Sequence, residues 1–451
     1  MLKQGKIELN LSSPRLAAVV DLIEWIDKKQ IRFRDRKDFN GSLDYSLYRF
    51  ITSDAIRHCS MFFFLIEMLT QRRISKLDRE VLACLLVGLV QLMHLDKINE
   101  YAAVNETVNL VTHFNKKYLK GFVNANLRSF IRKRDALYNQ LKDQELPIKT
   151  SHPEWMVSRW VKQYGKQVAV KICESNNILP QLQIVLNPSK DVNTALVELK
   201  SHSFDVTDIH SKGFTILNPA GLFDTQFAQE GSFLVQDRSS QLLNDIVKPL
   251  AKKRVLDACA SPGGKMFHLE WYNGNEIDEL IGLDISEFRV RKLNENKKRL
   301  NSKALIIQAD ARLSGLKNKF DLILVDAPCS GTGVIQKHPE IKWNRKIDDF
   351  SQNQQSQLDL LNGLKVDIKD GGHILYSTCS LEEEENQMVI NRFLAENESG
   401  FSVVPIQMEM SDDTMVDENG YFRCLPNGKQ MGMFAALLKK ESASRGSEHI
   451  S

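Results

Sequence analysis

Two stretches that each run from an apolar segment into a cysteine-bearing loop decide the fold: Phe320–Gly333 (FDLILVDAPCSGTG) and Gly371–Ser380 (GGHILYSTCS). Continuous apolar runs such as LILV and ILY are typical of strands that are covered on both faces of a parallel sheet. In open α/β sheets, ligands bind beyond the carboxyl ends of the strands. We therefore expect Cys329, Cys379 and Asp326 to converge where a substrate binds.

Strands and helices are predicted to alternate from about residue 242 onward, which is the pattern of a parallel α/β domain. Arg254–Ala260 is predicted to be a strand that opens into the turn Ser261–Lys265 (SPGGK) and then a helix. Later strands are expected to end at the acids Asp284, Asp310 and Asp326. Glycines in such a turn let the backbone approach a ligand, and strand-end acids accept hydrogen bonds from ribose hydroxyls. The pattern therefore predicts a nucleoside ligand.

The glycine turn also indicates which nucleoside is bound. It does not match GxGxxG, which argues against NAD or FAD, and it lacks the GxxxxGK[ST] order of a phosphate-binding loop. A ligand with an adenosyl group and no phosphates fits best, and we expect S-adenosyl-L-methionine.

Composition bounds the class of protein. A chain of 451 residues, with 42% hydrophobic and 26% charged residues, is expected to hold two to four soluble domains. Its seven cysteines are scattered, with no CxxC pair and no Cys/His zinc spacing, so we expect reduced thiols, a cytoplasmic location and no metal. The longest apolar run, Val81–Leu95, is too short and interrupted to span a bilayer and is expected to be a buried helix.

Residues 1–142 are predicted to be an all-helical bundle, because apolar residues recur there at three- and four-residue spacing. Basic residues gather in two places, and each cluster is either a solvated helix face or a surface that contacts RNA phosphates. The early cluster is Lys28, Lys29, Arg32, Arg34, Arg36 and Lys37, and the late cluster is Lys116, Lys117, Lys120, Arg128, Arg132, Lys133 and Arg134.

Residues 143–235 are predicted to form a linker helix, at Trp155–Tyr164, followed by a small α+β module. The module contains a strand (LQIVL) and a helix (NTALVELKSH). The α/β domain is predicted to extend over residues 236–440, and residues 441–451 are predicted to be a flexible tail.

The cysteines differ in their expected roles. Cys59, Cys84, Cys173 and Cys424 are expected to be buried and inert, and Cys259 is expected to pack inside the glycine turn. Cys329 and Cys379 follow strand ends between small residues that leave a thiol accessible. A thiolate that attacks C6 of a pyrimidine gives C5 enamine character, so that C5 can accept a methyl group, and an acid such as Asp326 can hold cytosine protonated. The base must leave its stack to reach such a site.

Residues 236–440 resemble the catalytic domain of the RNA cytosine-5 methyltransferases. The resemblance rests on DACASPGGK (Asp257–Lys265), DAPCSGTG (Asp326–Gly333) followed by HPEIKW, and YSTCS (Tyr376–Ser380), with Ser261 where alanine is usual. It implies that Cys379 is the nucleophile and that Cys329 assists release of the methylated RNA. It also implies that S-adenosyl-L-methionine is bound by Cys259, Ala260, Ser261, Pro262, Gly263, Gly264, Lys265, Asp284, Asp310 and Asp326.

The helical region resembles the NusB-like RNA-binding fold at Asn105–Val108 (NETV) and Gly121–Arg128 (GFVNANLR). The whole chain is thus similar to the bacterial 16S rRNA cytosine-5 methyltransferases of the NusB-appended type. This implies a multidomain protein with an N-terminal all-α NusB-like bundle, a small α+β middle module and a C-terminal Rossmann-like domain. The implied substrate is 16S rRNA.

Two alternatives remain open at this point. The same chemistry could act on tRNA or another RNA, since only the helical region favours rRNA, or the chain could be a non-catalytic RNA-binding or assembly factor. A DNA cytosine methyltransferase is disfavoured because no Glu-Asn-Val tripeptide occurs, and adenine amino-methylation because DAPC replaces the Pro-Pro-aromatic turn. A monomer is expected, because no heptad or self-pairing strand is evident.

Overall fold

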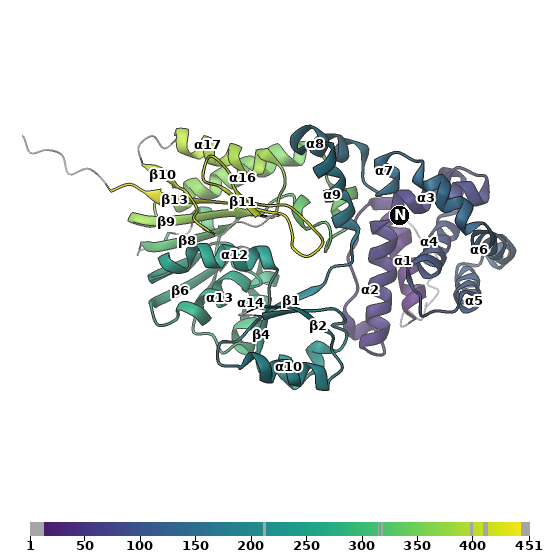
Figure 1. Cartoon of the computed structure of the whole chain (residues 1–451), viewed down its shortest axis with the longest axis horizontal. Helices are drawn as coiled ribbons and strands as arrows, with labels where there is room; N and C mark the ends of the chain where they lie inside the picture. Colours follow the sequence, from purple (N-terminus) through teal and green to yellow (C-terminus); the bar gives the residue numbers. More distant parts are fainter. Residues whose placement is uncertain are drawn as a thin grey trace, which may run out of the picture. The chain divides into compact units, whose positions relative to one another are not determined.

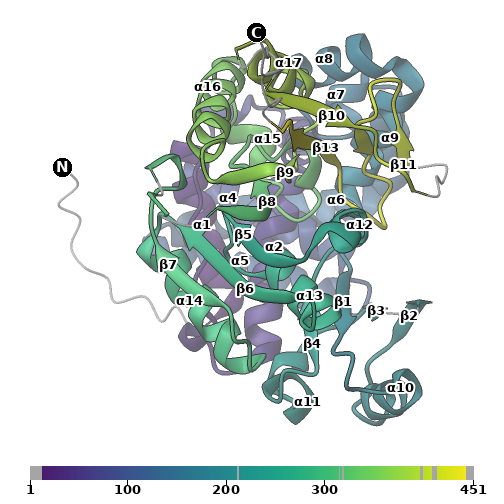
Figure 2. The same ribbon diagram turned by 90° about the vertical axis from the view of Figure 1, so that its left-hand side faces the viewer.

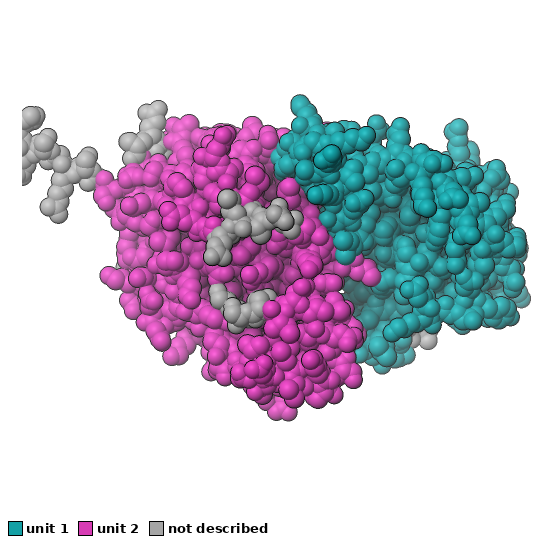
Figure 3. All heavy atoms as spheres, in the orientation of Figure 1, with its two compact units in different colours: residues 1–178, 337–344 teal, residues 179–336, 345–451 magenta. Residues whose placement is uncertain are grey.

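The computed structural model describes residues 13–210, 213–313, 315–316, 319–396, 400–408 and 414–442. The chain divides into two compact units (Figure 3): Met1–Ile178 with Lys337–Asn344, and Leu179–Gln336 with Arg345–Ser451. The predicted tail at 441–451 lies outside the described residues from position 443 onward. Among the described helices, none has the length and apolar character needed to span a membrane.

The first unit is built from helices (Figure 1), as predicted for residues up to about 140. Its short 3-10 turns lie at Arg36–Asp38, Ile74–Lys76, Val111–Phe114 and Lys117–Leu119. The helix expected at Trp155–Tyr164 is α8, and the short α7 lies in the predicted linker. The α-helices are α1 (Pro14–Lys28), α2 (Ser42–Arg57), α3 (Cys59–Thr70), α4 (Arg79–His94), α5 (Glu100–Leu110), α6 (Lys120–Lys142), α7 (Leu146–Lys149), α8 (Glu154–Tyr164), α9 (Lys166–Asn177) and α15 (Ile341–Asn344).

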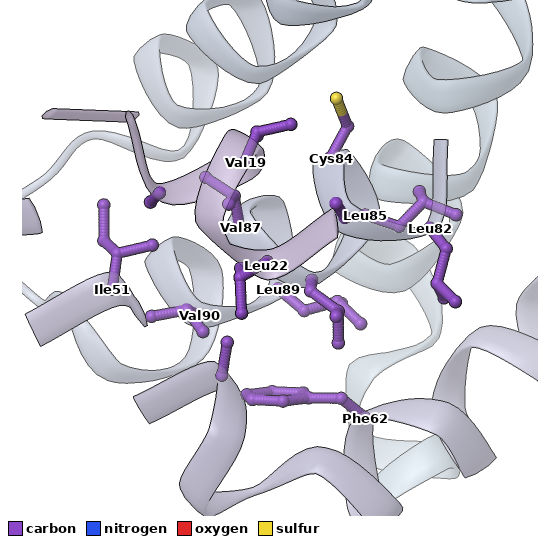
Figure 4. Close-up of a cluster of buried hydrophobic side chains, with 14 of the residues drawn as sticks. Val19, Leu22, Ile51, Phe62, Leu82, Cys84, Leu85, Val87, Leu89 and Val90 are labelled. Carbon is purple, nitrogen blue, oxygen red and sulfur yellow. The ribbon is translucent and has the colours of Figure 1, made fainter. Parts of the chain in front are cut away.

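Helix α4 forms the centre of this unit. Every residue from Val81 to Leu92 is buried, which is the behaviour of a helix that is apolar on all sides. Figure 4 shows Leu22 of α1, Ile51 of α2 and Phe62 of α3 around the α4 side chains. The prediction that the apolar run at Val81–Leu95 is a buried helix is confirmed.

The segment Lys337–Asn344 completes the first unit, although it is distant from the other helices in sequence. Lys342 is fully buried, and its Nζ donates hydrogen bonds to the carbonyl oxygen of Arg57 at 2.7 Å and to Oδ1 of Asn177 at 3.0 Å. Burial and the neighbouring Arg57 guanidinium hold the pKa of Lys342 well below its usual range. Trp343 donates from Nε1 to the carbonyl oxygen of Ile56 at 2.8 Å and packs edge-on against Trp25.

The second unit begins with a small antiparallel sheet of order β2-β3-β1-β4. Its strands are β1 (Leu182–Leu186), β2 (Val206–His210), β3 (Gly213–Ile216) and β4 (Phe233–Val235), with helices α10 (Val192–Ser201) and α11 (Gln226–Gln229) and a 3-10 turn at Leu222–Asp224. Its core includes Ile184, Leu199 and Phe214. This is the small α+β module predicted from the sequence.

The rest of the second unit is a nine-stranded sheet of order β11-β12-β13-β9-β8-β5-β6-β7, with β10 paired to β13 (Figure 2). Strands β5 to β9 pair in parallel as predicted, whereas β10 to β13 add an antiparallel edge. The strands are β5 (Lys253–Asp257), β6 (Ile277–Asp284), β7 (Leu305–Gln308), β8 (Phe320–Asp326), β9 (Ile368–Thr378), β10 (Phe401–Val404), β11 (Thr414–Val416), β12 (Phe422–Cys424) and β13 (Met433–Lys440).

Helices cover both faces of the parallel strands. They are α12 (Arg238–Val247), α13 (Gly264–Asn273), α14 (Glu287–Arg299), α16 (Ile347–Leu364) and α17 (Gln387–Glu396), and further 3-10 turns lie at Lys248–Leu250, Ala311–Leu313, Thr332–Val334 and Glu383–Glu385.

The side chains of β8 alternate between two hydrophobic cores. Leu322 and Leu324 lie in the core with residues of α12 and α13, and Ile323 and Val325 lie in the core with residues of α16 and α17. Successive side chains of a strand point to opposite faces, so a strand covered on both faces must be apolar throughout. This explains the LILV run, and it fixes the carboxyl ends of β5, β6, β8 and β9 at one edge of the sheet.

We predict that Lys342→Met destabilises the first unit in a pH-dependent way. The pKa of Lys342 is lower in the folded state than in the unfolded state, where it is about 10.4. Between these two pKa values the unfolded chain binds more protons, so the free energy of unfolding of the wild type rises with pH. The variant lacks this gain in stability. It also removes the donor to the carbonyl oxygen of Arg57 and to Oδ1 of Asn177, and the loss of these hydrogen bonds costs about 1–3 kcal/mol. Urea unfolding followed by tryptophan fluorescence should therefore show a stability difference that grows as the pH rises towards about 10.

Tryptophan fluorescence suits this measurement, since Trp25, Trp155, Trp160 and Trp343 belong to the first unit. Lys97→Met, at an exposed lysine of the same unit, is the matched control and should leave the transition unchanged. Parallel pH dependences for wild type and Lys342→Met would contradict the account of Lys342.

Candidate active site

The carboxyl ends of the parallel strands bring the predicted acids and cysteines to one edge of the large sheet. Asp257, Asp284 and Asp326 are the last residues of β5, β6 and β8. Cys379 directly follows β9, and Cys329 lies three residues beyond β8. Strands β8 and β9 pair in parallel with Asp326 opposite Ser377, so the two cysteine loops leave the sheet side by side.

The two cysteines are in direct contact. Their sulfur atoms lie 3.2 Å apart, at the distance of a hydrogen bond in which one thiol donates to the other sulfur. The hydrogen bond to Cys379 and the burial of the side chain both raise the pKa of the Cys329 thiol well above its usual range. The nucleophilic form of a cysteine is its thiolate, and a thiolate in this pair would accept the hydrogen bond from the other sulfur.

An ion pair between the buried Lys265 and the partly exposed Asp326 lies beside the cysteines. Lys265 Nζ contacts Asp326 Oδ2 at 2.6 Å, and Ser377 Oγ donates to Asp326 Oδ1 at 3.2 Å. Burial opposes the charge on Lys265, but Asp326, Asp257 and Cys379 together raise its pKa. Lys265 is therefore a buried cation that interacts with both Asp326 and Cys379. The edge therefore combines a paired nucleophile with an acid that is already oriented.

The glycine turn at Cys259–Lys265 is held against the end of β6 and against α14. Cys259 N donates to Asp257 Oδ1 at 3.3 Å, and Ala260 N donates to the carbonyl oxygen of Leu283 at 2.8 Å. Burial raises the pKa of Asp257 to about 7, although Lys265 opposes the shift.

The far side of the turn is anchored by α14. Ser261 Oγ donates to the carbonyl oxygen of Arg289 at 3.0 Å, and Asn296 Nδ2 donates to the carbonyl oxygen of Pro262 at 2.9 Å. Gly263 has φ +103°, and a Cβ there would clash with the ring of Phe267, so glycine is required at this position.

The acids near the ends of β6 and β7, Asp284 and Asp310, have different surroundings. Asp284 is almost fully buried, and its Oδ1 accepts a hydrogen bond from Ser286 N at 3.0 Å. Asp310 was expected at a strand end, but β7 ends at Gln308, and the Asp310 carboxylate is held by the Arg312 guanidinium at distances of 2.6–3.0 Å. The strand stops early because the chain turns into the 3-10 segment that presents Arg312.

The remaining cysteines are not part of the thiol pair. Cys59, Cys84 and Cys173 are buried in the first unit, and burial raises the pKa of each thiol. Cys424 is buried in β12, and Cys259 is partly buried inside the glycine turn. Burial of this kind makes a thiol unreactive.

A further carboxylate at the site, that of Glu385, was not predicted from the sequence. It is fully buried and accepts hydrogen bonds from Ser330 and Ser380, the residues that follow the two cysteines. Its position in the run LEEEEN resembles a solvated acidic stretch. The only signal in the sequence is the short distance from YSTCS, which places the run at the same sheet edge.

One group of potential metal ligands occurs in the described residues, and it lies in the first unit. Donor atoms of Asp54, His58 and His94 lie within 4.8 Å of one another. Asp54 already accepts from His94 Nδ1 at 2.5 Å and lies 4.0 Å from the Arg57 guanidinium. The Asp54 carboxylate therefore has partners within the protein. The expectation that the protein holds no metal stays a prediction.

Known proteins resemble the whole chain. Residues 244–439 match the family described as 16S rRNA methyltransferase RsmB/F, residues 13–132 match the NusB family, and residues 152–221 match the RsmF/B-like ferredoxin-like domain. The solved structure of PH0851 has a TM-score of 0.74 at 22% identity, covering 98% of this chain and 100% of that one, which shows the fold.

Two sequence relatives are similar over most of their length. The probable ribosomal RNA small subunit methyltransferase B of Bacillus subtilis (strain 168) is 34% identical over 332 residues, covering 72% of this chain and 74% of the relative. The ribosomal RNA small subunit methyltransferase B of Proteus mirabilis (strain HI4320) is 30% identical over 395 residues, covering 86% and 91%.

These matches agree with the predicted fold class: a NusB-like N-terminal domain, a small middle module of the ferredoxin-like type and a C-terminal methyltransferase domain. The boundaries proposed at residues 142 and 235 stay predictions. With relatives above 30% identity matched over most of their length, the chain belongs to the RsmB/F family of 16S rRNA methyltransferases.

Proposed function

We propose that this protein transfers a methyl group from S-adenosyl-L-methionine to C5 of a specific cytosine in 16S rRNA, through a covalent bond between Cys379 and C6. The observation that carries the proposal is the 3.2 Å contact between Cys329 and Cys379, beside the ion pair of Lys265 and Asp326. Two thiols, a cation and an acid at one strand edge match what covalent pyrimidine methylation requires.

The residues at the glycine turn fit an adenosyl cofactor. A Cβ on Gly264 would make only ordinary contacts, at 3.8 Å from the carbonyl oxygen of Val235 and 3.9 Å from Gln236, so the backbone where α13 begins is not crowded. Asp284 presents a nearly buried carboxylate for ribose hydroxyls, and the exposed apolar side chains of Ile285 and Phe288 follow it. S-adenosyl-L-methionine, when bound, supplies an electrophilic methyl group. The residues proposed to hold it are Cys259, Ala260, Ser261, Pro262, Gly263, Gly264, Lys265, Asp284, Asp310 and Asp326.

Asp310 fits this role least directly, since Arg312 holds its carboxylate. Two roles are proposed for Asp326. It contacts Lys265 at the glycine turn, which suits cofactor binding, and it lies opposite Ser377 next to the cysteine loops, which suits contact with the base. We assign it to the exocyclic amine and N3 of the cytosine, because Lys265 and Ser377 fix both of its oxygens in place.

The covalent step follows from the chemistry of the base. The Cys379 thiolate bonds to C6 and the C5–C6 π electrons shift, so that C5 becomes nucleophilic and accepts the methyl group. A base, which can be a water molecule, then takes the C5 proton, the C5–H electron pair forms the C5–C6 double bond again, and the S–C6 bond breaks with its electrons staying on sulfur. Lys265 stabilises the thiolate at the start and at the end of this cycle. Cys329, in contact with Cys379, assists release of the methylated RNA.

The first unit offers a surface for the RNA. Within the late basic cluster, Lys117, Arg128, Arg132 and Lys133 are exposed. Lys116 is instead paired with Asp78 and Glu80, and Arg134 is paired with Glu100. Exposed cations along one helix and the turn before it suit phosphate contacts. We propose that this part of α6 binds RNA, and that the protein acts as a cytoplasmic monomer.

The substrate is tested by incubating the purified protein with labelled S-adenosyl-L-methionine and unmodified 16S rRNA. We expect label in a single cytosine, located by bisulfite sequencing. Label in tRNA and none in 16S rRNA would favour the alternative of the same chemistry on another RNA. Absence of label in every RNA would favour a non-catalytic assembly factor.

We predict opposite phenotypes for the two cysteine variants. Cys379→Ala should abolish methylation, because no sulfur bonds to C6. Cys329→Ala should accumulate a protein–RNA adduct that survives a denaturing gel, because attack proceeds and release is slowed. Accumulation of the adduct in Cys379→Ala would reverse the two roles.

We predict that Gly333→Ala impairs the site through the Cys379 loop. Gly333 N donates to the carbonyl oxygen of Cys379 at 2.9 Å, and a Cβ at this position would lie 2.9 Å from that oxygen and clash with the carbonyl of Gly432. The loop must shift, and we expect kcat to fall at least about tenfold, since displacements near 1 Å cost this much or more. Methylation kinetics measure the change.

Gly41→Ala is the control, because a Cβ there meets nothing within 4 Å and its backbone is extended. It should keep wild-type kcat. Unchanged kcat in Gly333→Ala would show that the Cys379 carbonyl does not need this close approach.

A further inference from the structure

A single buried carboxylate joins the two cysteine loops. Glu385 Oε1 accepts a hydrogen bond from Ser330 N at 2.7 Å, and Oε2 accepts one from Ser330 Oγ at 2.5 Å and one from Ser380 Oγ. Asn353 Nδ2 of α16 donates to Oε1 at 2.7 Å. Ser330 directly follows Cys329 and Ser380 directly follows Cys379, so the carboxylate holds both loops at the residue next to each sulfur.

The hydrogen bonds suit a charged carboxylate. Each of the four groups that contact it is an N–H or O–H that donates, so both oxygens act as acceptors and neither needs a proton. Glu385 is fully buried, and hydrogen bonds of this kind are what stabilise a buried carboxylate. Its backbone is fixed as well, because Tyr376 donates from its hydroxyl to the carbonyl oxygen of Glu385 at 2.6 Å.

The charges around the sulfur pair are unequal. Glu385 and Asp326 both act on Cys329 in the direction that disfavours its thiolate, together with Cys379 itself. Lys265, the buried cation of α13, interacts with Cys379. Arg345 Nε donates to the carbonyl oxygen of Ser330 at 2.8 Å, and the buried Tyr376 interacts with Cys329 and Glu385.

We propose that Glu385 is a positioning residue that sets the contact between the two sulfur atoms and keeps the proton on Cys329, so that Cys379 is the sulfur that ionises. This rests on the proposed function, since it explains how two cysteines in contact acquire different roles. Glu385 contacts both loops, but its negative charge and that of Asp326 act on Cys329, whereas the cation Lys265 interacts with Cys379. A single negative charge on the sulfur pair is therefore placed on Cys379 in this proposal.

The test measures which sulfur ionises first and needs neither RNA nor cofactor. The full-length protein is treated with limiting iodoacetamide, which reacts with thiolates, at a series of pH values, and the initial alkylation of each cysteine is read by peptide mass spectrometry. In wild type, we expect Cys379 to be alkylated at lower pH than Cys329. Alkylation of Cys329 at the lower pH would overturn the proposal without any variant.

Two variants separate charge from simple structure. Glu385→Gln keeps the size of the side chain and removes its charge, and we expect the pH midpoint of Cys329 to fall by about one unit, towards that of Cys379. Ser330→Ala removes one donor and keeps the charge, and it should leave the two midpoints separated as in wild type. Equal shifts in both variants, or no shift in Glu385→Gln, would reduce Glu385 to a structural group.

Methylation assays then distinguish this inference from the proposed function. With the proposal correct, Glu385→Gln lowers kcat and moves the pH profile, while KM for S-adenosyl-L-methionine stays at the wild-type value, and Glu385→Asp restores part of the rate because it keeps the charge. If wild type methylates no RNA but the two alkylation midpoints differ as expected, the proposed function fails and the role of Glu385 stands.

Discussion

The structure of this protein depends on the parallel pairing of β8 with β9. This pairing places Asp326 opposite Ser377 and sends two short loops off the same edge, so that two cysteines fifty residues apart in sequence meet at 3.2 Å. A shift of register by one residue would turn the side chains of one strand to the opposite face and separate the sulfurs. Such a shift would also disrupt the packing of β8 and β9 against the helices on both faces of the sheet.

The site around this contact is a small network of paired charges. Lys265 and Asp326 neutralise each other next to Cys379, and Glu385 is satisfied entirely by hydrogen-bond donors next to Cys329. Buried charges are tolerated only when they are paired or hydrogen-bonded, and each of these groups is. The same arrangement gives the two thiols different surroundings. Two cysteines in one site need such a difference if one is to attack the base and the other is to assist release.

Much of this arrangement could be predicted from the sequence. The runs at Phe320–Asp326 and Gly372–Thr378 are apolar enough to predict buried strands, and the glycine turn predicts a ligand next to β5. The roles of Glu385 and Arg312 could not be predicted, because an acid in LEEEEN or a basic residue two positions after Asp310 has no local signal of burial or pairing. The segment Lys337–Asn344 is a similar case. Its lysine and tryptophan pack with the first unit, and only tertiary contacts reveal this.

The most direct test of the central claim uses 16S rRNA transcribed with 5-fluorocytidine. Fluorine at C5 cannot leave as a proton does, so the bond between sulfur and C6 persists after methyl transfer. Wild-type protein with S-adenosyl-L-methionine is expected to form a stable complex, and peptide mapping is expected to place the modified nucleotide on Cys379. A complex attached through Cys329, or methylation of unmodified 16S rRNA without any complex on the fluorinated transcript, would contradict the account.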